Sequence, residues 1–188
     1  MGQYYDILLK REKYEHYDRS VDGNYMMAKL TEHSWWRNET CAAVCRLIYP
    51  EPAKVYWIGD YADGADPVNG MTEAETRSVF RKCYGKRALK DRTLSGKNPL
   101  YLDKMYLVNY TKAQYIDCSE FYEKSLNKSG WAMYPLPLLT AIGNGLGGGD
   151  YRGVNEGLIG IWAGDLIGVS SIAPENFEKN EVYFKEEF

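Results

Sequence analysis

Histidine is scarce in this chain, and several familiar metal-binding and catalytic patterns are missing. The 188 residues contain two histidines and four cysteines, with neither a Cys-x-x-Cys nor a His-x-x-x-His spacing. Structural zinc sites normally use such spacings, and histidine is the usual general base near neutral pH. The sequence therefore predicts no metal site, no cofactor and no catalytic residue, and it favours a non-enzymatic protein over an enzyme.

Long apolar runs and basic stripes are also missing. No stretch approaches the ~18 apolar residues of a membrane span, and the start M-G-Q-Y-Y-D lacks the regions of a secretory signal. The formal net charge is −3, and the basic residues are not gathered into a stripe that would neutralise phosphates. We expect a cytoplasmic protein with reduced cysteines and neither a membrane nor a nucleic-acid partner.

The length and the order of predicted elements define the expected fold. A chain of 188 residues is long enough for one well-packed domain, 1–188, and too short for two. The apolar run from Gln3 to Leu9 predicts a strand covered on both faces, and Lys54 to Ile58 predicts a second strand. Asn38 and the capping box at Thr72 predict two helix starts. The expected class is α+β, a mostly antiparallel sheet with about two helices packed on one face.

Glycine is concentrated toward the end of the chain. Ten of the 18 glycines lie between Gly143 and Gly168, and the stretch from Ile142 to Gly153 reads I-G-N-G-L-G-G-G-D-Y-R-G. Each glycine inside a helix or strand costs roughly 0.5 to 1 kcal/mol relative to alanine, so this density indicates a loop. The loop is either a nest of amides that holds a phosphate or a tight turn between strands. It matches neither the P-loop nor the dinucleotide-binding fingerprint. Strands are expected at 157–162 and 166–170.

Polar residues beside the glycine turns form the predicted ligand site. Acidic residues at strand ends are common ligand contacts, although Asp is more often a plain turn residue that bonds its own backbone. The predicted ligand-binding residues are Asp60, Asn144, Gly147, Gly148, Gly149, Asp150, Tyr151 and Asp165. A glycine turn that held a phosphate would bind a nucleotide-like or other phosphorylated small molecule.

The cysteines and aromatic residues are interpreted first as packing residues. Cys41 and Cys45 share one helical stripe with Val44 and Ile48, which predicts core positions rather than a metal or nucleophile site with His33. Aromatic residues make up 14% of the chain, led by 17 tyrosines. Tyrosine suits half-buried sheet faces and also protein interfaces.

Several segments resemble a group of uncharacterised proteins from bacterial and phage genomes. They read M-G-Q-Y-Y, W-I-G-D-Y-A-D, N-Y-T-K, P-L-P-L-L-T-A-I-G-N-G-L-G-G-G-D-Y-R-G and W-A-G-D, and together they span most of the chain. The resemblance implies a small cytoplasmic, phage-linked protein and transfers no catalytic residue.

Two functional hypotheses follow from these features. The few general bases and the many Tyr and Trp residues favour a non-enzymatic protein-interaction module. Such a module would bind a protein partner as an accessory factor in phage–host conflict, of inhibitor or immunity type. The alternative is a nucleotide or phosphorylated small-molecule binding protein, or a hydrolase, that uses the glycine-rich loop 143–153.

Overall fold

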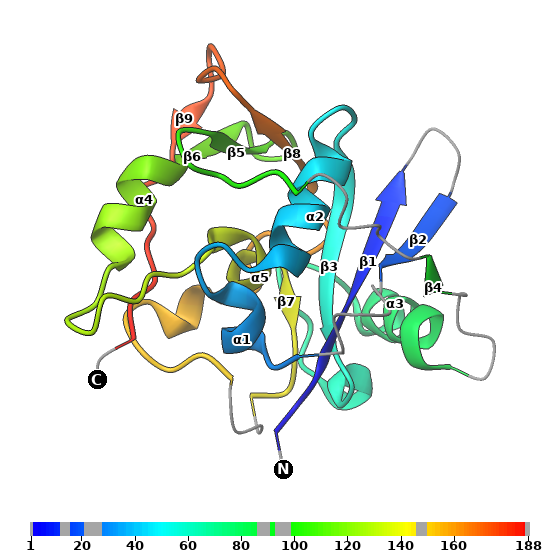
Figure 1. The fold of residues 1–188 in the computed structure, drawn as a ribbon. Helices are drawn as coiled ribbons and strands as arrows, with labels where there is room; N and C mark the ends of the chain where they lie inside the picture. The colour runs from blue at the N-terminus through cyan, green and yellow to red at the C-terminus, as the bar shows by residue number, and fades with distance from the viewer. Residues whose placement is uncertain are drawn as a thin grey trace.

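The described part of the chain contains one sheet of nine strands, which runs through the fold (Figure 1). The computed structural model describes residues 2–11, 16–20, 28–85, 91–92, 99–145 and 150–186. Within them the strand order is β4-β2-β1-β3-β8-β5-β6-β9, and β7 pairs with β3 off this path. No helix in these ranges has the length and apolar content needed to cross a bilayer.

The elements have the following bounds. The strands are β1 (Tyr5–Arg11), β2 (His16–Ser20), β3 (Ala53–Gly59), β4 (Asp91–Arg92), β5 (Tyr106–Asn109), β6 (Gln114–Asp117), β7 (Ala141–Ile142), β8 (Leu166–Ser170) and β9 (Glu178–Lys179). The helices are α1 (Leu30–Ser34), α2 (Glu39–Ile48), α3 (Glu73–Tyr84), α4 (Cys118–Ser125) and α5 (Pro135–Leu139), with short 3-10 turns η2 (Ala62–Gly64) and η3 (Glu156–Leu158).

The sheet is mostly antiparallel, as the sequence predicts. The pairs β1–β2, β1–β3, β3–β8, β5–β6 and β5–β8 are antiparallel. The pairs β2–β4, β3–β7 and β6–β9 are parallel. In the central pair, the register of β1 and β3 runs from Tyr5 opposite Gly59 to Lys10 opposite Lys54.

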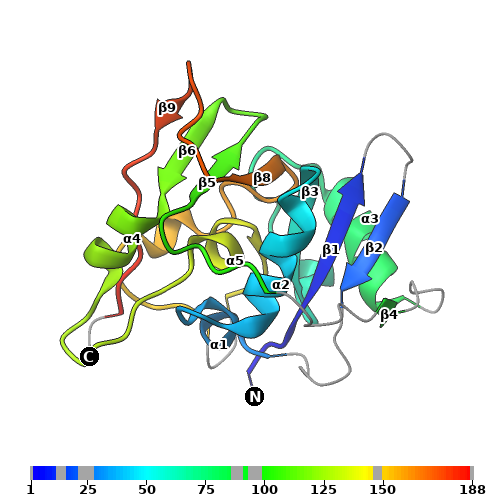
Figure 2. The same cartoon turned by 45° about the horizontal axis from the view of Figure 1, so that its top comes forward.

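Helices cover both faces of the central strands, so the expectation of about two helices on one face is wrong. The described residues form five α-helices. Ile7, Leu9 and Trp57 belong to the larger core, together with residues of α1, α2, α4 and α5, whereas Leu8 and Ile58 pack with α3 on the opposite face. Figures 1 and 2 show α2 and α3 on opposite sides of β1 and β3. The physical reason is that successive residues of β1 and β3 are apolar, and both faces of a sheet with that pattern must be buried.

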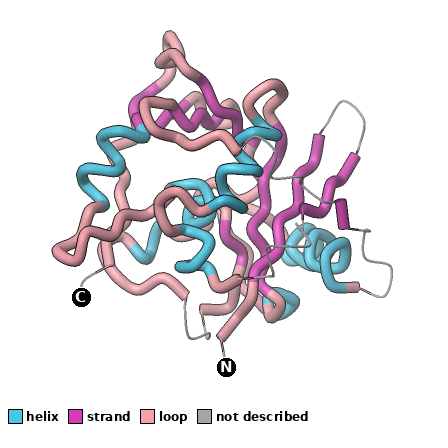
Figure 3. The backbone as a smooth tube through the Cα atoms, viewed as in Figure 1, coloured by secondary structure: helices cyan, strands magenta, loops and turns pink. Residues whose placement is uncertain are grey.

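The local signals in the sequence have mixed outcomes. The caps are confirmed: the Asn38 side chain accepts from the Cys41 amide at the start of α2, and Thr72 and Glu75 form a capping box on α3. Residues 166–170 form β8, but 157–162 form turns rather than a strand, and Figure 3 shows mostly loop between β7 and β8. The two unexpected helices α1 and α5 have five residues each, which is too short for a visible helical period.

Candidate functional site

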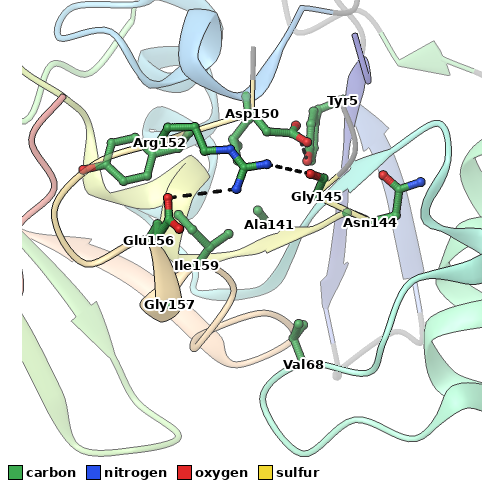
Figure 4. Close-up of a pocket in the computed structure, with 13 residues that line it drawn as sticks. Tyr5, Val68, Ala141, Asn144, Gly145, Asp150, Arg152, Glu156, Gly157 and Ile159 are labelled. Atoms are coloured by element: carbon green, nitrogen blue, oxygen red, sulfur yellow. Dashed lines mark hydrogen bonds and ion pairs between the residues drawn. The ribbon is translucent and has the colours of Figure 1, made fainter. Parts of the chain in front are cut away.

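A cavity of about 390 Å³ lies beside the glycine-rich segment (Figure 4). Its lining comes from β1, the start of α1, β7 and the chain on either side of residues 146–149, which themselves lie outside the described residues. A volume of this size is typical of small-molecule sites. The lining combines aliphatic side chains with a few polar groups, and it includes Tyr5, Leu30, Ala141, Asn144, Asp150, Arg152, Glu156 and Ile159.

Two residues from the beginning of the chain hold the polar wall of this cavity. The Tyr5 hydroxyl donates to Asp150 Oδ1 at 3.1 Å. The Gln3 amide nitrogen donates to Asn144 Oδ1 at 3.1 Å and, over a longer 3.4 Å, to Asp150 Oδ2. Gln3 is fully buried and Tyr5 is 2% exposed, so these bonds form in a region of low dielectric constant, where they orient the Asp150 carboxylate firmly.

Two glycines make room for this arrangement. A Cβ on Gly143 would lie 2.3 Å from the Tyr5 hydroxyl oxygen, and a Cβ on Gly59 would lie 2.0 Å from Gln3 Oε1. Gly59 is the cross-strand partner of Tyr5, and Gly143 follows directly after β7, which pairs with β3. Both strand ends therefore carry glycine where the side chains of Gln3 and Tyr5 approach the backbone.

Charge is unevenly distributed over the cavity wall. Burial and the adjacent Asp150 carboxylate raise the pKa of Tyr5 far above its usual value, so the hydroxyl remains a proton donor at every physiological pH. Arg152 donates from Nη2 to the Gly145 carbonyl at 2.8 Å, and its Nη1 lies 4.0 Å from Glu156 Oε2 (Figure 4). The described lining thus carries two carboxylates and one guanidinium.

A second hollow continues from the first and is more acidic. It has a volume of about 510 Å³, and it shares Val68, Gly143 and Asn144 with the first cavity. Its remaining lining includes the carboxylates of Asp63 and Asp66 and the half-exposed ring of Tyr61. Taken together, the two hollows bring four carboxylates and one guanidinium around the Asn144 segment.

The structure brings together three of the eight predicted site residues. Asn144, Asp150 and Tyr151 line the cavity. Tyr151 has a structural role as well, because its hydroxyl donates to the Val154 carbonyl at 2.7 Å and accepts from the Lys185 amide at 2.6 Å. Gly147, Gly148 and Gly149 lie outside the described residues.

The other two predicted residues lie away from this cavity. The Asp60 side chain accepts from the Tyr4 amide at 3.0 Å, which ties the residues before β1 to the end of β3. Asp165 is 6% exposed and accepts from Asn69 at 2.9 Å and from Asn109 at 2.7 Å. It also pairs with Lys112 at 3.0 Å, beside a separate polar cavity of about 250 Å³. Asp165 therefore does not join the predicted site.

Sequence reasoning missed four polar residues of the site. Gln3 and Tyr5 were assigned to a strand, and Arg152 and Glu156 were not singled out. The signal for Gln3 is a polar residue just before the largely buried strand β1. Such a residue must find a partner when it is buried, but only the pairing of β1 with β3 and of β3 with β7 brings that partner close.

The residues considered for nucleophilic or metal chemistry lie in the core. Cys41 and Cys45 are fully buried, as predicted, and burial raises the pKa of the Cys41 thiol. His33 is 2% exposed and its Nδ1 accepts from Trp57 Nε1 at 2.8 Å, while burial lowers its pKa to about 4. Among the described residues, no three His, Cys, Asp or Glu side chains are placed to hold a metal ion.

Comparisons of the chain with protein-family models, curated proteins and solved structures found no match.

Proposed function

We propose that this protein binds a small molecule with a positively charged group in the 390 Å³ cavity, through the carboxylate of Asp150. The observation that carries the proposal is the way Tyr5 and Gln3 hold that carboxylate at the cavity wall. Orienting a charged group before the ligand arrives lowers the entropy cost of binding.

The charges of the described lining favour a cation over the phosphorylated ligand expected from the glycine turn. Asp150 and Glu156 in the cavity, and Asp63 and Asp66 beside it, would repel a phosphate, and Arg152 is the single cationic side chain of the described lining. Like charges in a partly desolvated site cost more than in water, because the local dielectric constant is lower. Recognition of a cation by Asp150 accounts for this excess of carboxylates.

A charge-neutral variant of Asp150 tests the proposal. Primary amines and amino compounds would be screened against the wild type by thermal shift, and the best hits measured by isothermal titration calorimetry. Asp150→Asn should weaken binding by at least about tenfold, since a charge-assisted hydrogen bond contributes about 1.5 to 3 kcal/mol.

The matched control is Asp103→Asn, which removes the same charge from a half-exposed position next to Arg37, away from the cavity. Its affinity should equal that of the wild type. If no amine binds, or if the two variants lose affinity equally, the proposed site is wrong.

A protein-interaction module is the second candidate, and one surface feature favours it. Trp35 is 41% exposed and Trp131 is 54% exposed, and their ring centroids lie 5.4 Å apart. Exposed tryptophans are enriched at protein interfaces. Trp131→Ala should abolish recovery of a stoichiometric partner in a pull-down from a bacterial lysate, while Tyr49→Ala, at another half-exposed aromatic residue, should not. A wild-type protein that recovers no partner would count against this candidate.

A further inference from the structure

Arg152 places a cationic group at the same cavity as the fixed carboxylate of Asp150. Its guanidinium reaches the Gly145 carbonyl on one side and approaches Glu156 on the other (Figure 4). The side chain of Arg152 is 68% exposed and that of Glu156 is 52% exposed. An exposed ion pair at 4.0 Å contributes little to stability, so the guanidinium can turn toward a ligand at small cost.

The two charged groups can both be reached by one compact molecule. One residue, Tyr151, separates Asp150 from Arg152 along the chain, which limits the distance between their Cα atoms to about 7 Å. A guanidinium has five donors in a planar fork that fits a carboxylate with two parallel hydrogen bonds. A ligand that carries an ammonium and a carboxylate on the same carbon atom would satisfy both side chains.

Another part of the wall is aliphatic. Leu30 is 2% exposed and Ala141 is 1% exposed, and the partly buried side chains of Val68 and Ile159 complete this part of the lining. An apolar group of the ligand would bury its surface here, whereas a charged group would lose its hydration without a partner.

We infer that the ligand is a free α-amino acid with an aliphatic side chain, its ammonium at Asp150, its carboxylate at Arg152 and its side chain against Leu30 and Ile159. The inference rests on the proposed cation site and adds the carboxylate and the apolar group to it. No covalent step is involved.

Three ligands that share the isobutyl side chain of leucine separate the parts of the inference. Leucine carries both charges, 3-methylbutan-1-amine lacks the carboxylate, and 4-methylpentanoate lacks the ammonium. Isothermal titration calorimetry on the full chain should give leucine an affinity at least about tenfold above that of the amine, because a bidentate pair with Arg152 is added. The carboxylate ligand should bind most weakly, because it has no ammonium to pair with Asp150 and brings a second negative charge near it.

Arg152→Gln provides the decisive variant. It should reduce leucine binding to the level of the amine and leave the affinity for the amine unchanged. Arg37→Gln, at a side chain that is 69% exposed beside Asp103, is the matched control and should behave as the wild type. Circular dichroism melting of both variants checks that they fold.

The outcomes distinguish the inference from the function on which it rests. If the amine binds as tightly as leucine, and Asp150→Asn abolishes that binding, the amino-acid inference is wrong while the cation site stands. If 4-methylpentanoate binds better than the amine, both are wrong. If none of the three ligands binds, the amino-acid inference is wrong, and the wider amine screen decides the cation site.

Discussion

Two aspartates that look alike in the sequence lie in contrasting surroundings. Asp150 and Asp165 both follow glycine directly, and both were predicted as site residues. Asp165 is nearly fully buried, where side chains from two other loops, Asn69 and Lys112, and from the end of β5, Asn109, converge on it. Asp150 is half-buried at a cavity wall, where it accepts from Tyr5 and Gln3 at the beginning of the chain.

The contrast indicates what a Gly-Asp turn can become. An aspartate that meets several donors from different loops becomes a structural tie, because its removal breaks several hydrogen bonds at once. An aspartate that is oriented at a cavity wall presents its charge to a ligand. The turn sequence is the same in both cases, so the difference lies in what the rest of the fold brings close.

The largest expected effect is on stability, and it should differ between variants of the two aspartates. Asp165→Ala should lower the free energy of unfolding by about 2 to 4 kcal/mol, because it leaves the buried Asn109 amide without its acceptor and removes the charge partner of Lys112, which keeps its bonds to Asn69 and Ile161. Asp150→Ala should cost about 1 to 2 kcal/mol, since water from the cavity can fill the space that the carboxylate leaves. Urea denaturation monitored by circular dichroism measures both values. If the two variants lost the same free energy of unfolding, Asp165 would not differ from Asp150 as a structural residue.

The next effect is a loss of stability at low pH, which we expect from His33. The pKa of this buried histidine is lowered to about 4 from an ordinary value near 6.5, because burial disfavours the charged ring. Between these pH values the unfolded chain binds a proton that the folded chain does not. His33 therefore costs no stability above pH 6.5. As the pH falls, proton binding by the unfolded chain lowers the free energy of unfolding, and this loss reaches about 3 kcal/mol at pH 4.

A variant of His33 isolates this effect from the other titrating groups. His33→Asn keeps an acceptor for the Trp57 indole but has no proton to gain. Urea unfolding at pH 7 and at pH 4 should show a loss of stability that is smaller in the variant by about 3 kcal/mol. If the variant and the wild type lose the same free energy of unfolding between pH 7 and pH 4, His33 is not a neutral core residue.

A smaller effect is expected at the glycines of the cavity itself. Gly143→Ala should cost about 1 to 3 kcal/mol, because the added methyl group meets the Tyr5 hydroxyl and must displace a fully packed ring. Gly157→Ala is a matched control in the same cavity, where a Cβ would meet nothing within 4 Å. It should change stability by less than about 0.5 kcal/mol. Thermal melting of the two variants side by side gives the comparison.

The fold was predictable where local rules decide it. The caps at Asn38 and Thr72 and the dominance of antiparallel pairing could be anticipated, because capping depends on residues close in sequence. The apolar run of β1 indicates that both faces of the sheet are covered, whereas the predicted architecture places helices on one face only. Residues 157–162 look like a strand by composition, and tertiary contacts hold them as turns instead: the Gly160 and Trp162 amides donate to carbonyls of α5.

The site was predictable only in part, because its partners are distant in sequence. Asn144 and Asp150 stand in a conspicuous glycine-rich stretch, but Gln3 and Tyr5 lie about 140 residues earlier in an ordinary strand. Their role depends on the register of β1 against β3 and of β3 against β7, which one sequence does not reveal. For the same reason nothing local distinguishes Asp165 from Asp150.

The smallest predicted effect tests whether Tyr5 acts through Asp150. Tyr5→Phe keeps the buried ring and removes only the hydroxyl that donates at 3.1 Å, so stability should fall by about 1 kcal/mol or less. Amine binding should weaken by about 2- to 10-fold, because the carboxylate loses a fixed orientation while keeping its charge. Tyr4→Phe, at the half-exposed neighbour, should change neither quantity. In the Asp150→Ala background the effect of Tyr5→Phe on binding should vanish, since the acceptor of the Tyr5 hydroxyl is then absent. An effect of Tyr5→Phe that persists undiminished in that background would mean that Tyr5 acts independently of Asp150, and that the cavity wall is not organised by their hydrogen bond.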